Sequence, residues 1–149
     1  MLDARNSVAD ASNAVDLHPV DGQLSFKGVS FRYPAPAETS VASLETDAVP
    51  GESGRTVLHD INLTVEPGQM LAIVGPSGSG KSTMAALVTR LYDVTAGKIT
   101  LDGHDLRSLR QDGLRAQVGV VTQDPHFFHD TIGSNLRYAR PDATETELD

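Results

Sequence analysis

Two segments in the first half of the chain alternate apolar and polar residues, which is typical of half-buried strands. In the first, residues 23–33, the apolar positions hold one parity up to Phe26 and the opposite parity from Val29 onward. The change of parity near Lys27–Gly28 predicts a β-bulge. The second segment, residues 56–65, carries spaced apolar positions and leads into a turn. Both segments therefore predict β-structure early in the chain.

A different pattern occupies the middle of the chain. Residues 70–74 form a short apolar run, as a buried parallel strand would. From Met84 to Leu91, apolar residues recur at the i, i+3, i+4 and i+7 spacing of one helical face. The sequence therefore predicts a strand, a glycine-rich connection over residues 75–83 and a helix, in that order.

The second half of the chain holds shorter predicted elements. Residues 117–122 contain three valines and favour a buried strand, because β-branched residues fit a pleated surface. A helix is expected to begin near Asp130–Thr131, with Ile132 and Leu136 on its inner side. The other predicted elements are a strand over 98–101, a turn at 102–103, a weak helix over 107–115 and the start of another helix in the acidic residues near Asp149.

Two segments lack any such periodicity. Residues 1–21 are polar and small, and are predicted to be a polar linker or disordered tail. Residues 34–55 combine prolines and glycines with serine, threonine and acidic residues, so they are predicted to form a long loop insertion. The predicted domain is therefore residues 22–149, interrupted by this insertion.

Residues 75–82 read Gly-Pro-Ser-Gly-Ser-Gly-Lys-Ser and fit the phosphate-binding pattern G-x-x-x-x-G-K-[ST] without mismatch. Glycines let backbone N–H groups approach phosphate oxygens that a Cβ would obstruct. Lys81 can reach the outer phosphates as a mobile charge, and the Ser82 hydroxyl suits Mg²⁺. A glycine-rich turn that matches by chance is the alternative. The predicted strand and helix on either side disfavour it, because they place the loop at a helix N-terminus.

Composition and charge narrow the class of protein. The 149 residues include 39% hydrophobic and 21% charged residues, as in an ordinary soluble domain, and no cysteine, which excludes disulfides and thiolate metal sites. No apolar run approaches the roughly 18 residues of a membrane span, and the N-terminus lacks the apolar region of a secretory signal. The net charge of −8 argues against a nucleic-acid partner. It leaves ATP possible, because phosphates are bound by local N–H groups and one lysine.

Further short motifs flank the phosphate-binding pattern. They are Phe31-Arg32-Tyr33-Pro34, Leu91-Tyr92-Asp93, Leu101-Asp102-Gly103, Val120-Val121-Thr122-Gln123-Asp124-Pro125, Thr131-Ile132 and Asn135-Leu136. Together with the loop, this series resembles the nucleotide-binding domain of ABC transporters and is most similar to the exporter branch. The resemblance covers roughly residues 22–148. It implies an α/β fold, namely a P-loop NTPase core of the ABC type with an N-terminal antiparallel β subdomain.

The resemblance also implies roles for individual residues. Tyr33 matches the aromatic residue that stacks on adenine, the alternative being a core tyrosine at a strand end. Gln123 matches the glutamine that contacts Mg²⁺ and the attacking water. Residues 124–132 resemble the segment that receives the coupling helix of a membrane domain, although Phe127 and Phe128 could equally anchor their loop in the core. The nucleotide contacts implied by the match are Tyr33, Gly75, Ser77, Gly78, Ser79, Gly80, Lys81, Ser82 and Thr83, with Mg²⁺ held by Ser82 and Gln123.

The family pattern implies ATP and Mg²⁺ as cofactors. It implies two partners: a transmembrane domain, in the same or a separate chain, and a second nucleotide-binding domain arranged head to tail. The expected location is the cytoplasmic side of the cell membrane through the membrane partner, or the cytoplasm if the chain stands alone.

Three motifs of the family do not occur in residues 1–149: the Leu-Ser-Gly-Gly-Gln signature, a strand ending in Asp-Glu and a later switch histidine. The chain is therefore expected to be truncated before the helical subdomain is complete, and to hydrolyse ATP poorly alone. One alternative is a non-catalytic nucleotide-binding or interaction module, or the remnant of a disrupted reading frame. Another is a soluble P-loop kinase or GTPase. The β-rich sequence before the loop and the lack of an Asn-Lys-x-Asp motif disfavour that class.

Overall fold

The computed structural model describes residues 8–17, 19–34, 54–121, 127–138 and 140–148. The chain divides into two compact units, residues 1–118 and residues 119–149.

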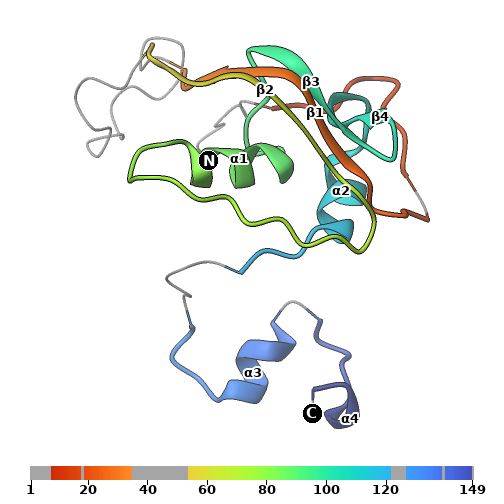
Figure 1. The fold of residues 1–149 in the computed structure, drawn as a ribbon. Coiled ribbons are helices and arrows are strands. Elements are labelled where there is room, and N and C mark those ends of the chain that lie inside the picture. Colours follow the sequence, from red (N-terminus) through yellow and green to blue (C-terminus); the bar gives the residue numbers. More distant parts are fainter. Residues whose placement is uncertain (1–7, 18, 35–53, 122–126, 139, 149) are drawn as a thin grey trace, which may run out of the picture. The chain divides into compact units, whose positions relative to one another are not determined.

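A four-stranded sheet forms the frame of the first unit (Figure 1). Its strands are β1 (Leu24–Arg32), β2 (Thr56–Val65), β3 (Ala96–Leu101) and β4 (His104–Asp105), in the spatial order β2-β1-β3-β4. Each neighbouring pair is antiparallel. The predicted antiparallel β subdomain is therefore present.

The predicted change of register in β1 is confirmed at Gly28. Between Phe26 and Val29, β1 advances three residues while its neighbour β2 advances only from Leu63 to Ile61. One extra residue on one strand defines a β-bulge, and Gly28 has the positive φ of 62° that glycine tolerates. As a result Phe26 and Val29, which differ in parity, are both buried.

Helices cover one face of this sheet (Figure 1). They are α1 (Lys81–Val88), the short 3-10 helix η2 (Leu106–Ser108) and α2 (Gln111–Gln117). The core between the two layers is apolar, and removal of such surface from water is the main stabilising term of the fold. Its buried members are Phe26, Val29, Phe31, Leu58, Met84, Leu87, Ile99, Leu101, Leu106, Leu109 and Leu114.

Helix α1 ends earlier than its apolar spacing predicts. Arg90 takes a left-handed φ of 52°, its N–H donates to Leu87 O at 3.1 Å, and the Leu91 N–H donates to Ala86 O at 3.0 Å. This pair of bonds is a Schellman motif, which closes a helix. Leu91 was expected on the apolar face of the helix, but it lies beyond the helix end and is exposed, so that expectation is wrong.

The two predicted buried strands are not formed among the described residues. Residues 70–74 belong to no strand, and Met70 is 95% exposed; residues 118–121 belong to no strand either, and Val121 is 100% exposed. A strand in a parallel sheet is held by hydrogen bonds to its neighbours. Neither segment has a paired strand in the described parts of the chain, so the apolar sequence alone did not produce a strand.

Within the first unit, the N-terminal residues from Val8 to Asp16 pack on η2 and the start of α2. Gln111 donates its side-chain Nε2 to Val8 O at 3.1 Å, and its backbone N–H to Asp10 Oδ1 at 3.1 Å. Val15 forms a bridge with Leu109, in which the Val15 N–H donates to Ser108 O at 3.0 Å. The linker assignment of residues 1–21 stays a prediction, but its described part is docked beside η2 and α2.

The second unit contains α3 (Ile132–Arg137) and α4 (Glu145–Leu148). Thr131 caps α3, because its side chain accepts the Ser134 N–H at 3.1 Å. The helix start predicted near residues 130–131 is therefore confirmed. The predicted inner side is wrong, because Ile132 and Leu136 are 80% and 50% exposed and α3 has no buried residue. In the described ranges, no helix has the length and apolar character needed to cross a membrane.

Candidate nucleotide-binding site

The phosphate loop, residues 75–82, leads directly into α1. Gly78 and Gly80 have φ values of 76° and 90°, a region that glycine enters without a Cβ penalty. At Gly80, an added Cβ would lie 2.6 Å from Leu58 Cδ2. Leu58 is buried in β2 and has little room to move, so the loop can pass this close to the sheet only with glycine at position 80.

The first glycine of the loop leaves space inside it. A Cβ at Gly75 would lie 2.7 Å from Ser79 Oγ, so a larger residue would fill the concave side of the loop. A turn between Pro76 O and the Ser79 N–H, 3.3 Å apart, sets the curvature. Gly78 is exposed, and a Cβ there would meet nothing within 4 Å. The loop is thus an open turn with backbone accessible to a ligand.

The start of α1 offers hydrogen-bond donors to an anion. The first N–H groups of any helix have no acceptor within the helix, and no side chain of the described residues caps α1. The helix dipole adds partial positive charge at the same place. Phosphate oxygens are the groups that such a terminus accommodates.

Lys81 brings a cation to the concave side of this loop. Its Nζ donates to Gly75 O at 3.0 Å, to Pro76 O at 2.8 Å and to Ser79 Oγ at 3.3 Å. The ammonium group therefore lies against the loop backbone, although its own backbone belongs to α1. A flexible lysine with three donors can exchange such carbonyl acceptors for phosphate oxygens.

The two residues after Lys81 differ in exposure. Ser82 is exposed, so its hydroxyl is accessible as a ligand, whereas Thr83 is buried. One protein hydroxyl is a small part of a Mg²⁺ coordination shell. It suffices in a nucleotide site, because waters and phosphate oxygens supply most of the ligands there. The donor set of the loop, backbone N–H groups, one ammonium and one accessible hydroxyl, fits the phosphates of Mg-ATP.

Tyr33 lies next to the phosphate loop in space. Its hydroxyl and that of Thr83 form a hydrogen bond of 3.0 Å, although 50 positions separate the two residues. The side chain is half-buried, and its ring makes edge contacts with Phe31 and Tyr92. The tyrosine therefore packs against the core, as the alternative reading proposed, and also remains partly accessible beside the loop. Its role in stacking on adenine stays a prediction.

Gln123 and its neighbours, residues 122–126, lie outside the described residues, so its contact with Mg²⁺ stays a prediction. Across the described ranges, no group of three or more His, Asp or Glu side chains could hold a metal ion. Phe127 and Phe128 are 74% and 58% exposed, so within their own unit they do not anchor a core. Phe128 instead packs on Tyr138, with ring centroids 4.5 Å apart.

Sequence reasoning missed two parts of the site. Leu58 shapes the loop from β2, and Tyr92 supports Tyr33 from the segment after α1. The position of Tyr92 in a short motif was visible in the sequence, but no local pattern connected it with Tyr33. Both contacts depend on the packing of distant segments.

Comparison with known proteins assigns the family. The family model "ABC transporter" matches residues 58–148. The chain is 43% identical over 142 residues to "ATP-binding cassette sub-family B member 6" of Xenopus tropicalis, a match that covers 95% of this chain and 15% of that protein. It is also 43% identical to the "ATP-dependent lipid A-core flippase" of Pectobacterium atrosepticum, over 84% of this chain and 19% of the flippase.

A solved structure agrees in fold. It is described as a bacterial Atm1-family ABC exporter with ATP bound, and matches with a TM-score of 0.78 at 39% identity, over 95% of this chain and 22% of that one. The chain belongs to the ABC transporter family and has the fold of its ATPase domain, and exporters are among its relatives. It spans only about a fifth, or less, of the length of the relatives named above.

Proposed function

We propose that residues 75–83 bind the phosphates of Mg-ATP as part of an exporter-type ABC ATPase domain. Lys81 takes the outer phosphates, the N–H groups at the start of α1 take the inner ones, and Ser82 contributes to Mg²⁺. Tyr33 contacts adenine from beside the loop, and Gln123 completes the Mg²⁺ site. The observation that carries this proposal is the Lys81 ammonium, 3.0 Å from Gly75 O and 2.8 Å from Pro76 O, at the start of a helix that no side chain of the described residues caps.

When bound, ATP would supply the phosphoryl group that is transferred to water, and this transfer releases free energy. In phosphoryl transfer the protein acts mainly by positioning and by charge stabilisation. We infer that hydrolysis occurs when two such domains meet head to tail, and that it drives export through a transmembrane domain in the same or a separate polypeptide. The described relatives include a flippase and an exporter, which supports this assignment. It would place the domain at the cytoplasmic side of a membrane.

The second unit supplies the contact with the membrane domain in this proposal. Phe127, Phe128 and Ile132 are exposed apolar residues within a short stretch, and their exposure within this unit is the feature that supports a docking role. Aromatic residues are enriched in the buried centres of protein interfaces. The coupling helix of a transmembrane domain is the proposed partner.

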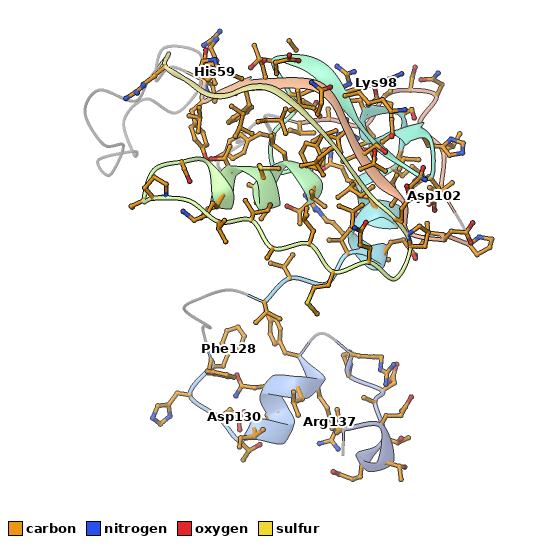
Figure 2. All side chains as sticks on the ribbon, in the orientation of Figure 1. His59, Lys98, Asp102, Phe128, Asp130 and Arg137 are labelled. Carbon is orange, nitrogen blue, oxygen red and sulfur yellow. The ribbon has the colours of Figure 1, made fainter. Side chains whose placement is uncertain are left out.

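Nucleotide affinity tests the proposal. Lys81→Ala removes the ammonium group, and the loss of a hydrogen bond to a charged group, about 1.5–3 kcal/mol, corresponds to roughly a 10- to 100-fold weaker binding of Mg-ATP. Lys98→Ala is the matched control. Lys98 is an exposed lysine of β3 on the side of the sheet away from α1 (Figure 2), so its removal should leave the affinity unchanged.

Two outcomes would contradict the assignment. Equal ATP affinities for the wild type and Lys81→Ala would mean that the phosphate loop does not bind ATP. A clear preference for GTP over ATP would instead favour the kinase or GTPase class. Both comparisons are made by equilibrium titration with a fluorescent nucleotide and competition by the unlabelled one.

A further inference from the structure

Three aromatic rings form a cluster next to the phosphate loop. Phe31 and Tyr33 have centroids 4.9 Å apart with planes at 81°, and Tyr33 and Tyr92 have centroids 5.3 Å apart with planes at 88°. Phe31 and Tyr92 close the triangle at 5.7 Å. The two T-shaped pairs are a preferred aromatic geometry, with the positive edge of one ring against the negative face of the other.

The three rings come from three segments: β1, the residues just after β1, and the residues just after α1. Phe31 belongs to β1, is 1% exposed and so is fixed in the core. Tyr33 follows β1 and reaches the first turn of α1 through Thr83. Tyr92 follows the turn that ends α1 and is half-buried against the core. Tyr33 is therefore held from both ends of the helix that begins at Lys81.

These contacts restrict how Tyr33 can move. The hydroxyl of Tyr33 is bound to Thr83, so the outer end of the side chain is fixed relative to the phosphate loop. The ring of Tyr92, nearly perpendicular to that of Tyr33, limits rotation and lateral displacement of the Tyr33 ring. A stacking platform that is already fixed loses less conformational freedom when a base binds it.

We propose that Tyr92 is a positioning residue for the nucleotide base. It acts through Tyr33, by holding the ring of Tyr33 at the place set by the Thr83 hydrogen bond. This inference rests on the proposed function, in which Tyr33 contacts adenine. Its consequence is selective: Tyr92 affects the binding of a nucleotide that has a base, and it does not affect the binding of the phosphate chain alone.

Competition binding on the full chain with two probes, Mg-ATP and Mg-tripolyphosphate, tests the inference. The expected result for Tyr92→Leu is an ATP affinity about two- to tenfold lower, the range of one aromatic pair, with unchanged affinity for tripolyphosphate. Tyr92→Phe keeps the ring and is expected to restore the ATP affinity. Tyr138→Leu, which removes an exposed tyrosine of the second unit, is the control and should change neither affinity.

Each outcome decides the inference. Equal weakening of ATP and tripolyphosphate by Tyr92→Leu would mean that Tyr92 only supports the fold, and no effect on either would mean that it does not position Tyr33. If Tyr92→Leu does not fold, Tyr92→Met replaces it, because an unbranched side chain fills the gap without a ring. Failure of the proposed function has a different signature: wild type and Lys81→Ala would bind tripolyphosphate equally.

Discussion

Asp102 and Gln23 join the end of β3 to the start of β1 across 79 positions of sequence. The Asp102 carboxylate accepts the backbone N–H groups of Gln23 at 2.7 Å, Asp21 at 2.8 Å and Gly22 at 3.0 Å. In return, the Asp102 N–H donates to Gln23 O at 2.8 Å. Asp102 also occupies the turn between β3 and β4 (Figure 2), with a left-handed φ of 48°. One residue thus fixes both the hairpin and the entry of the chain into the sheet.

The first prediction concerns pH. Burial raises the pKa of Asp102, but hydrogen bonds from the Gln23, Gly22 and Asp21 N–H groups, with the charge of His104, outweigh burial and lower the pKa below its usual value. A lowered pKa in the folded state gives stability that is present above the unfolded pKa and lost as the pH falls through the folded pKa. Asp102→Asn should therefore be less stable than wild type near neutral pH, and this difference should shrink below about pH 4.

Urea unfolding at several pH values measures that difference. Asp142→Asn, a change at an exposed residue of the second unit, serves as the control and should parallel the wild type. An Asp102→Asn variant whose stability followed the wild type at every pH would show that the carboxylate does not hold the strand entry.

The second prediction concerns Arg90, whose side chain is only 3% exposed. Its guanidinium donates to Leu109 O at 2.9 Å and to Ala9 O at 3.2 Å, and pairs with Asp93 at 3.1 Å. Arg90→Ala leaves a buried carbonyl without its donor, so the free energy of unfolding should fall by about 2–3 kcal/mol. Arg90→Gly should be about 1 kcal/mol less destabilised than Arg90→Ala, because glycine tolerates the left-handed φ of 52°.

Denaturant unfolding of the two Arg90 variants provides this comparison. The control is Arg110→Ala, which removes an exposed pair with Asp16 at 3.7 Å and should cost less than about 1 kcal/mol. If Arg90→Ala and Arg110→Ala had the same free energy of unfolding, the contacts of Arg90 with the N-terminal residues would not stabilise the fold.

The third prediction separates two glycines of the phosphate loop. Both Gly78→Ala and Gly80→Ala place a Cβ at a positive φ, which costs about 1 kcal/mol. Only at Gly80 does the new Cβ also meet a buried side chain, Leu58, 2.6 Å away. Gly80→Ala should therefore lose about 1–3 kcal/mol more stability than Gly78→Ala. Thermal unfolding of the two variants measures this, and equal transition temperatures would count against the close packing of the loop on β2.

The fourth prediction concerns the second unit. Asn135 binds the loop before α3 twice at Phe128: its Oδ1 accepts the Phe128 N–H at 2.7 Å, and its Nδ2 donates to Phe128 O at 3.1 Å. Asn135→Ala should release this loop and speed hydrogen exchange of the Phe128 amide about tenfold, the equivalent of one hydrogen bond. Thr146→Ala, at an exposed residue of α4, should leave that exchange rate unchanged. An unchanged rate in Asn135→Ala would mean that other contacts hold the loop.

Local sequence determined the features that depend on neighbouring residues. The parity change around Gly28 predicted the bulge, the glycines and Lys81 predicted the phosphate loop, and Thr131 predicted the start of α3. In each case the cause is short-range: side chains alternate along a strand, glycine admits positive φ, and a threonine hydroxyl caps the next turn.

The tertiary structure decided the features that need a distant partner. Tyr33 meets Thr83 across 50 positions, and Arg90 meets Ala9 across 81, and neither pairing leaves a periodic signal. Residues 70–74 show the converse. Their apolar run predicted a strand, but no described segment pairs with them. A strand exists only with a neighbour to share its hydrogen bonds, and the left-handed φ of Arg90 is held by the contacts that its side chain makes with Leu109 O and Ala9 O. Local sequence specifies the first kind of feature, and packing of remote segments specifies the second.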